Sequence, residues 1–189
     1  MSHDDREHWD QQHAAREPLG PPARFLVDHT GELPVGRTLD LAAGTGRNAL
    51  HLAARGHRVL AVDASRVALQ AIRRRAPDVD VACVDLDAAA FRRASVDSIV
   101  CVNFLDRTLF ASFARWLRPG GVLLLDTFLI DQREHGHPKN PAFLLERNEL
   151  LARLPEFRIL AFREGRVGDG EAASYRSGVV AELRSQAIN

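Results

Sequence analysis

Residues 39–46 are Leu39-Asp40-Leu41-Ala42-Ala43-Gly44-Thr45-Gly46, and this stretch decides the fold. An apolar strand carries an acid near its end, a turn of small residues follows, and an amphipathic helix opens at Arg47. Small residues let the backbone approach a ligand closely, and a helix N-terminus offers that ligand free N–H groups. A carboxylate at Asp40 suits a ligand with an ammonium group and would repel a pyrophosphate. The stretch therefore predicts a ligand site between a strand and a helix.

Strand and helix patterns alternate along the chain around this turn. Apolar strand patterns lie at 37–41, 58–62, 79–84, 97–102 and 122–128. Helical patterns lie between them at 46–55, 65–76 and 109–117, and an earlier short helix is indicated at 22–29. Pro119-Gly120-Gly121 is typical of a turn before the fifth strand. This alternation predicts an α/β fold with a parallel sheet, right-handed crossovers and helices on both faces.

The end of the chain departs from the alternation. After a helical pattern at 146–154 come two strand patterns, at 157–164 and 173–183. A short loop that contains Gly165, Gly168 and Gly170 joins them, which predicts a hairpin. The last strand should then run antiparallel to the others, whereas a plain dinucleotide-binding fold would end in a parallel strand.

The pattern D/E-x-(G/A)-x-G-x-G at 40–46 resembles motif I of the class I S-adenosylmethionine-dependent methyltransferases. The stretch Ala-Ala-Gly-Thr-Gly-Arg-Asn, and much of the chain from about Trp9 to Leu183, resembles the small bacterial methyltransferases of the tellurite-resistance group. The resemblance implies a Rossmann-like class I methyltransferase fold, with a seven-stranded, mostly parallel sheet and a C-terminal antiparallel hairpin. It also implies one domain over residues 1–189, with residues 1–30 as an N-terminal helical lid.

Acids stand at the carboxyl ends of three predicted strands, where open α/β sheets bind their ligands: Asp40, Asp63 and Asp85. The carboxylate of Asp63 can accept hydrogen bonds from both hydroxyls of a ribose, unless it only caps a turn. The carboxylate of Asp85, or that of Asp87, can accept from an exocyclic amino group beside the backbone N–H of Leu86. The resemblance assigns S-adenosyl-L-methionine to a set of ten positions: Asp40, Ala42, Gly44, Gly46, Asn48, Asp63, Ala64, Asp85, Leu86 and Asn103.

Three segments are candidates for the acceptor side. The first is the N-terminal helix with Trp9, Asp10 and His13, and the second is the stretch from Asn103 to Thr108 with Asp106 and Arg107. The third runs from Thr127 to Phe143, which is long for a loop in a compact domain, and such loops are often functional. The candidate catalytic residues are Asn103, Arg107, His135 and His137. The two histidines can act as bases, bind an anion or be merely solvated, and no metal site is expected.

The charge composition limits the kinds of molecule that the protein is expected to bind. Lys+Arg and Asp+Glu each number 25 in 189 residues, and this balance argues against binding to nucleic acid or a membrane surface. The polar N-terminus is unlike a signal peptide, and Cys83 and Cys101 lie in apolar strand patterns as expected for buried thiols of a reducing compartment. We therefore expect a cytoplasmic protein, a monomer or a homodimer, that methylates a small molecule.

Two other functions remain open at this stage. Residues 44–49 also fit the G-x-G-x-x-G/A pattern of nucleotide-dependent oxidoreductases, although Asp40, Asp85 and the terminal hairpin argue against it. A protein that binds the cofactor without methyl transfer is the other alternative. The acceptor is expected to be a thiol, a chalcogen oxyanion or another small nucleophile, and a general base is required only if that acceptor is protonated.

Overall fold

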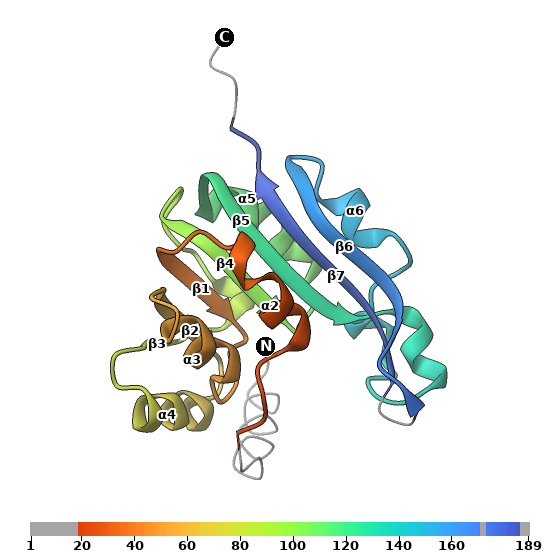
Figure 1. Cartoon of the computed structure of the whole chain (residues 1–189), viewed down its shortest axis with the longest axis horizontal. Helices are drawn as coiled ribbons and strands as arrows, with labels where there is room; N and C mark the ends of the chain where they lie inside the picture. Colours follow the sequence, from red (N-terminus) through yellow and green to blue (C-terminus); the bar gives the residue numbers. More distant parts are fainter. Residues whose placement is uncertain (1–18, 171–172, 186–189) are drawn as a thin grey trace.

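The protein folds around a seven-stranded sheet with the strand order β3-β2-β1-β4-β5-β7-β6 (Figure 1). This computed structural model describes residues 19–170 and 173–185. The strands are β1 Arg37–Leu41, β2 Arg58–Asp63, β3 Asp80–Cys83, β4 Val96–Val102, β5 Leu117–Phe128, β6 Phe157–Val167 and β7 Ser174–Leu183. Strands β1 to β5 pair in parallel, and β7 runs antiparallel to both β5 and β6. The predicted class I methyltransferase fold with its C-terminal hairpin is confirmed.

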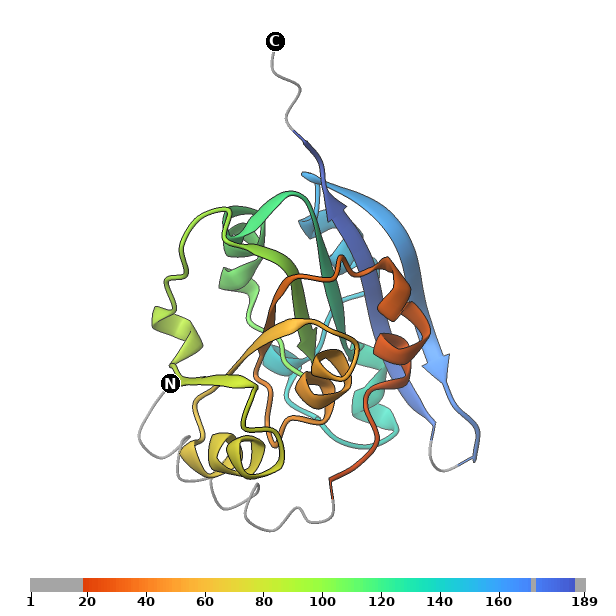
Figure 2. The ribbon, with the colours of Figure 1, turned by 60° about the vertical axis from the view of Figure 1, so that its left-hand side comes forward.

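Helices cover both faces of the sheet, as predicted. Figures 1 and 2 show α2 (Arg24–His29), α3 (Arg47–Ala53) and α4 (Arg66–Arg75) on one face. Their buried side chains, such as Phe25, Leu52 and Ile72, pack with Val100 and Leu124 of the sheet. The opposite face carries α5 (Phe110–Trp116) and α6 (Glu149–Arg153). The two faces thus bury separate apolar clusters, which hold the central strands from both sides.

Strand β5 begins five residues before the predicted start at Val122, because a bulge continues the pairing through the proline-glycine turn. Leu117 pairs with Val96 and Val122 with Ser98, so the register shifts between these two pairs. Gly121 is required there, since a Cβ at this position would lie 2.9 Å from the carbonyl oxygen of Arg118. The predicted turn Pro119-Gly120-Gly121 thus lies within β5, between its first two pairs with β4.

The segment between β5 and α6 is ordered by contacts with the sheet. It contains two short 3-10 helices, η4 (Ile130–Glu134) and η5 (Pro141–Phe143), and lies beside the start of β7 in both views (Figures 1 and 2). The N–H of Leu145 donates to the carbonyl of Phe128 at 2.9 Å, and that of Leu129 donates to Tyr175 at 3.0 Å. This long loop therefore has a defined path at the carboxyl edge of the sheet.

Three expectations need correction or fall outside the described residues. Helix α6 starts at Glu149 and not at Glu146, because Asn148 has φ 61°, which does not continue a helix. Cys83 is exposed, since β3 is an edge strand, whereas Cys101 is buried as expected. The N-terminal helix with Trp9 lies outside the described residues. Within the part of the chain that is described, every helix is too short or too polar to cross a bilayer.

Candidate cofactor and acceptor site

The turn between β1 and α3 has the tight conformation that its small residues permit. Ala42, Gly44 and Gly46 have positive φ angles of 52°, 54° and 91°. A Cβ on Gly46 would lie 2.6 Å from Cγ1 of Ile72, so a larger residue would push α3 away from α4. The N–H of Ala43 donates to the carbonyl of Val62 at 3.0 Å, which ties the turn to the end of β2. The predicted cofactor turn and the predicted ribose acid are therefore brought together.

Asp63 joins the ends of two parallel strands through both carboxylate oxygens. Oδ2 accepts the N–H of Gly44 at 2.7 Å, and Oδ1 accepts the N–H of Ser65 at 2.8 Å. Ser65 in turn caps α4 by accepting the N–H of Ala68 on its hydroxyl, and Ala64 lies between the two. A carboxylate has about four lone-pair positions, so these two bonds leave room for ligand hydroxyls. Asp63 is thus both part of the fold and a candidate ligand contact.

Asp40 is a buried acid with incomplete pairing. Its Oδ2 has no hydrogen-bond partner among the described residues, while the N–H of Ala49, at the start of α3, bonds to the carboxylate. Burial first, and then the charge of Asp63, raise the pKa of Asp40 from 3.8 to about 7, against the opposing effects of Ala49 and Arg47. An unpaired buried carboxylate is costly unless a ligand satisfies it. Asp40 is therefore the strongest candidate for contact with a cationic ligand.

The adenine-side candidates lie next to Asp63. The N–H of Val84 donates to the carbonyl of Asp63 at 3.0 Å, which brings the end of β3 to the end of β2. Asp85 caps the 3-10 helix η2 (Leu86–Ala88) by accepting the N–H of Asp87 at 3.1 Å, and the side chain of Leu86 is buried in the core. Asp40, Asp63 and Asp85 therefore occupy consecutive strand ends at one edge of the sheet, as predicted.

Asn48 has a structural contact that the sequence did not predict. Its side-chain oxygen accepts the N–H of Ala23 at 3.0 Å, and the residue is buried. This bond joins the first turn of α3 to the start of α2. The predicted contact between Asn48 and the cofactor stays a prediction, and the amide oxygen is already in use.

Asn103 lies at the end of β4 and belongs to a charged cluster that sequence reasoning missed. Its φ is 59°, and its N–H donates to the carbonyl of Asp126 at 2.9 Å. Its Oδ1 accepts from Nη2 of Arg176 at 2.7 Å, and Arg176 also pairs with the buried carboxylate of Asp126, which Arg163 contacts as well. The sequence signal for this cluster is Asp126, a single acid within the apolar run 122–128.

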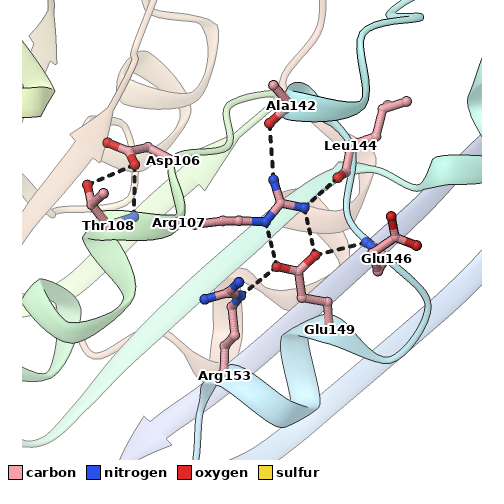
Figure 3. Close-up of polar contacts among 8 residues, drawn as sticks. All are labelled: Asp106, Arg107, Thr108, Ala142, Leu144, Glu146, Glu149 and Arg153. Carbon is pink, nitrogen blue, oxygen red and sulfur yellow. Dashed lines mark hydrogen bonds and ion pairs between the residues drawn. The ribbon is translucent and has the colours of Figure 1, made fainter.

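The contacts of Arg107 with Ala142, Leu144 and Glu149 form a structural clamp (Figure 3). Arg107 opens the 3-10 helix η3 (Arg107–Leu109), and its Nε and Nη2 donate to the two carboxylate oxygens of Glu149 at 2.7 and 2.8 Å. It also donates to the carbonyls of Ala142 and Leu144, at 3.2 and 2.8 Å. The guanidinium thus uses four of its five N–H groups to hold η5 and α6, and nothing in these contacts favours the predicted catalytic role.

The two candidate histidines are exposed on the loop after β5. His135 stacks on the ring of Tyr175 with centroids 4.5 Å apart, and the backbone carbonyl of His137 accepts from Gln132 at 3.2 Å. Gln132 is buried and also accepts the N–H of Tyr175 at 2.7 Å. Gln132 therefore fixes this loop to the start of β7. A catalytic role for the imidazole of His135 or His137 stays a prediction. Trp9, Asp10 and His13 lie outside the described residues.

The clamp gives a testable prediction for stability. Replacing Glu149 with glutamine should lower the free energy of unfolding by about 2 kcal/mol, because the carboxylate accepts charge-assisted bonds from Arg107 and Arg153. Glu182→Gln is the control, since Glu182 pairs with the more exposed Arg158 and should cost less than about 1 kcal/mol. Urea denaturation of both variants checks the difference, and equal losses would contradict a special role for Glu149.

The same clamp should weaken in acid. Burial tends to raise the pKa of Glu149, but Arg107, the N–H of Glu146 and Arg153 outweigh it and lower the pKa from 4.5 to about 2. The stabilisation is therefore complete above pH 4.5 and is lost as pH falls toward 2. The difference in unfolding free energy between the protein and its Glu149→Gln variant should shrink over that interval.

Comparison with known proteins agrees with this geometry. Residues 38–121 match a methyltransferase domain family. The chain is 34% identical to a demethylmenaquinone methyltransferase of Renibacterium salmoninarum over 69% of its length, and 39% identical to a cypemycin N-terminal methyltransferase of a Streptomyces species over 70%. It spans 54% and 60% of the lengths of these two relatives. The crystal structure of TehB from Haemophilus influenzae superposes with a TM-score of 0.73 at 18% identity, covering 95% of this chain and 67% of that one.

The fold, the motif at 40–46 and the domain match agree with one another. Residues 38–121 form a methyltransferase domain, and the sheet order with its antiparallel β7 is that of the class I S-adenosylmethionine-dependent methyltransferases. The cofactor of this family is S-adenosyl-L-methionine, and the structure fits it, because a buried carboxylate without a full set of partners lies beneath the glycine turn. The likeness to TehB shows the shared fold only, since the identity is low.

Proposed function

We propose that this protein transfers a methyl group from S-adenosylmethionine to a small nucleophilic acceptor. The observation that carries the proposal is Asp40, whose Oδ2 has no partner among residues 19–170 and 173–185 although the side chain is buried. A ligand with an ammonium or sulfonium charge would compensate this carboxylate, whereas a pyrophosphate would repel it. The buried carboxylate of Asp40 therefore favours methyl transfer over the nucleotide-dependent redox alternative.

The residues of this chain have separate tasks in the proposed reaction. Asp40 compensates the positive charge of the cofactor, Asp63 binds the ribose hydroxyls, and Asp85 with the backbone of Leu86 binds the adenine. When bound, S-adenosylmethionine supplies an electrophilic methyl group on a sulfonium. The protein mainly provides alignment and a dry site, and it needs no general base when the acceptor is already an anion.

The relatives and the charge composition indicate the class of acceptor. One relative is named for demethylmenaquinone, which supports a small-molecule acceptor, and the other is named for the N-terminus of cypemycin. We favour a thiol, a chalcogen oxyanion or another small nucleophile, because the 25 basic and 25 acidic residues of the chain leave no charge excess for nucleic acid. Residues 1–30 were expected to form a lid, but α2 within them packs in the core, so we propose that only the part of this segment before α2 acts as a lid. We also propose that the protein works in the cytoplasm as a monomer or homodimer.

Binding measurements test the cofactor assignment directly. Calorimetry should detect S-adenosylhomocysteine binding with a dissociation constant of low-micromolar order (about −8 kcal/mol at 1 μM) and no binding of NAD. The reverse result would overturn the proposal. Methyl transfer from labelled S-adenosylmethionine to a panel of small thiols, quinols and chalcogen oxyanions then distinguishes an enzyme from a protein that only binds the cofactor.

A further inference from the structure

Two arginines share one buried carboxylate at the carboxyl end of β5. Asp126, whose side chain is 3% exposed, accepts from Nη2 of Arg163 at 2.9 Å on Oδ1. Its Oδ2 accepts from Nη2 and Nε of Arg176 at 2.8 and 3.1 Å. Gly178 is the β7 residue opposite Asp126, and a Cβ there would lie 2.9 Å from Oδ1, so the glycine makes room for this cluster. All of the charged groups stand on strands, which fixes their positions.

The cluster has more positive charge and more donors than Asp126 can use. Two guanidiniums face one carboxylate, which leaves an excess of one positive charge. Nε of Arg163 is buried and has no partner within residues 19–170 and 173–185. Arg163 and Arg176 nevertheless keep 26% and 12% of their side-chain surfaces exposed, so both side chains reach the surface of the protein. A structural ion pair alone would not require the second arginine.

The cluster borders the expected point of methyl transfer. Nη2 of Arg176 lies 2.7 Å from Oδ1 of Asn103, which directly follows β4 at the same sheet edge as Asp40. The guanidinium of Arg163 lies over the ring of Phe25 at 4.4 Å, and that of Arg176 over Phe128 at 4.5 Å. These rings hold the guanidiniums flat and limit the entropy lost when a ligand binds.

We propose that Arg163 and Arg176 bind an anionic oxygen group, a carboxylate or a phosphate, on the methyl acceptor. The inference rests on the proposed methyl transfer and specifies its substrate class. Guanidinium donors match the geometry of carboxylate and phosphate oxygens. Asp126 orients the two arginines and balances one of their charges, so that an acceptor with a single anionic group neutralises the rest. A shift of the Arg163 side chain brings its buried, unpaired Nε to the acceptor, and Asn103 lies between this anion and the cofactor.

Anion binding to the full chain tests the proposal without requiring turnover. The protein saturated with S-adenosylhomocysteine is titrated by calorimetry with inorganic phosphate and, separately, with 3-mercaptopropionate, using 3-mercaptopropanamide as the uncharged partner. We expect binding of at least one anion and much weaker binding of the amide. Which anion binds more tightly distinguishes a phosphate-bearing from a carboxylate-bearing acceptor.

Two glutamine variants on the same strand provide the comparison. Arg163→Gln should weaken anion binding by roughly tenfold or more while S-adenosylhomocysteine affinity is retained. Arg158→Gln removes the same charge from β6 but from a pair with Glu182 at the other end of the strand, and it should leave anion affinity unchanged. If Arg163→Gln fails to fold, Arg163→Lys keeps the charge beside Asp126 and should still bind the anion several-fold more weakly, because it loses the forked donors.

The outcomes separate this inference from the proposed function. Anion affinity that is equal in the parent protein and in the Arg163 variant, or absent in a protein that binds S-adenosylhomocysteine, would overturn the acceptor proposal alone. A protein that does not bind S-adenosylhomocysteine would overturn the methyltransferase function as well.

Discussion

Replacing Asp63 with alanine should weaken S-adenosylhomocysteine binding by roughly a hundredfold and also destabilise the empty protein by about 3 kcal/mol. Its carboxylate accepts the N–H groups of Gly44 and Ser65, and hydrogen bonds to a charged group contribute about 1.5–3 kcal/mol each. The expected contacts with two ribose hydroxyls are of the same kind, and about 1.4 kcal/mol corresponds to a tenfold change in affinity. A residue that only bound the ligand would change affinity and leave the stability of the empty protein intact.

Calorimetry with S-adenosylhomocysteine and urea denaturation without it measure the two effects separately. Asp78→Ala is the control, since Asp78 is an exposed acid in the loop between α4 and β3. It should change neither quantity by more than about 0.5 kcal/mol. A stable Asp63→Ala protein with weakened binding would mean that the contacts with Gly44 and Ser65 contribute little, whereas normal binding would remove Asp63 from the cofactor site.

Local patterns predicted the first four strands closely, for a physical reason. Strand β1 spans Arg37–Leu41 as expected, and β2 is one residue longer than expected. In both strands the apolar run predicts the buried stretch, and the acid near its end predicts where the strand reaches the edge of the sheet that binds ligands. Helix α4 likewise begins where Ser65 caps it. These features depend on neighbours in the sequence.

The features that were missed depend on distant partners. Asp126 in an apolar strand makes sense only beside Arg163 and Arg176, which lie 37 and 50 residues away along the chain. Arg107 was a candidate for catalysis because it follows β4, but its carboxylate partner Glu149 lies 42 residues further on. Spacing within one segment cannot reveal such pairs, although a lone charge in an apolar run is a signal that one must exist.

Replacing Asp40 with asparagine should stabilise the empty protein above pH 7 while weakening its affinity for the cofactor. The folded-state pKa of Asp40 is about 7, above its ordinary value of 3.8, so the fold favours the protonated form. The stability that this provides is complete below pH 3.8 and is lost as pH rises through 7. At about 1.4 kcal/mol per pKa unit, the cost at pH 8 is about 2–4 kcal/mol, and the neutral amide avoids most of it.

The cofactor should respond to pH in the opposite sense. Only the ionised carboxylate attracts a cationic ligand, so the affinity of the parent protein for S-adenosylhomocysteine should rise as pH increases through about 7, and binding should release a proton near that pH. Calorimetry in buffers of different ionisation enthalpy measures the proton, and thermal denaturation from pH 5 to 8 measures the stability. The Asp40→Asn variant should show neither proton release nor the loss of stability, and Asp78→Asn should behave like the parent protein. An affinity that does not change with pH, in a parent protein whose stability also stays constant, would show that Asp40 does not titrate in this range and would contradict its proposed role.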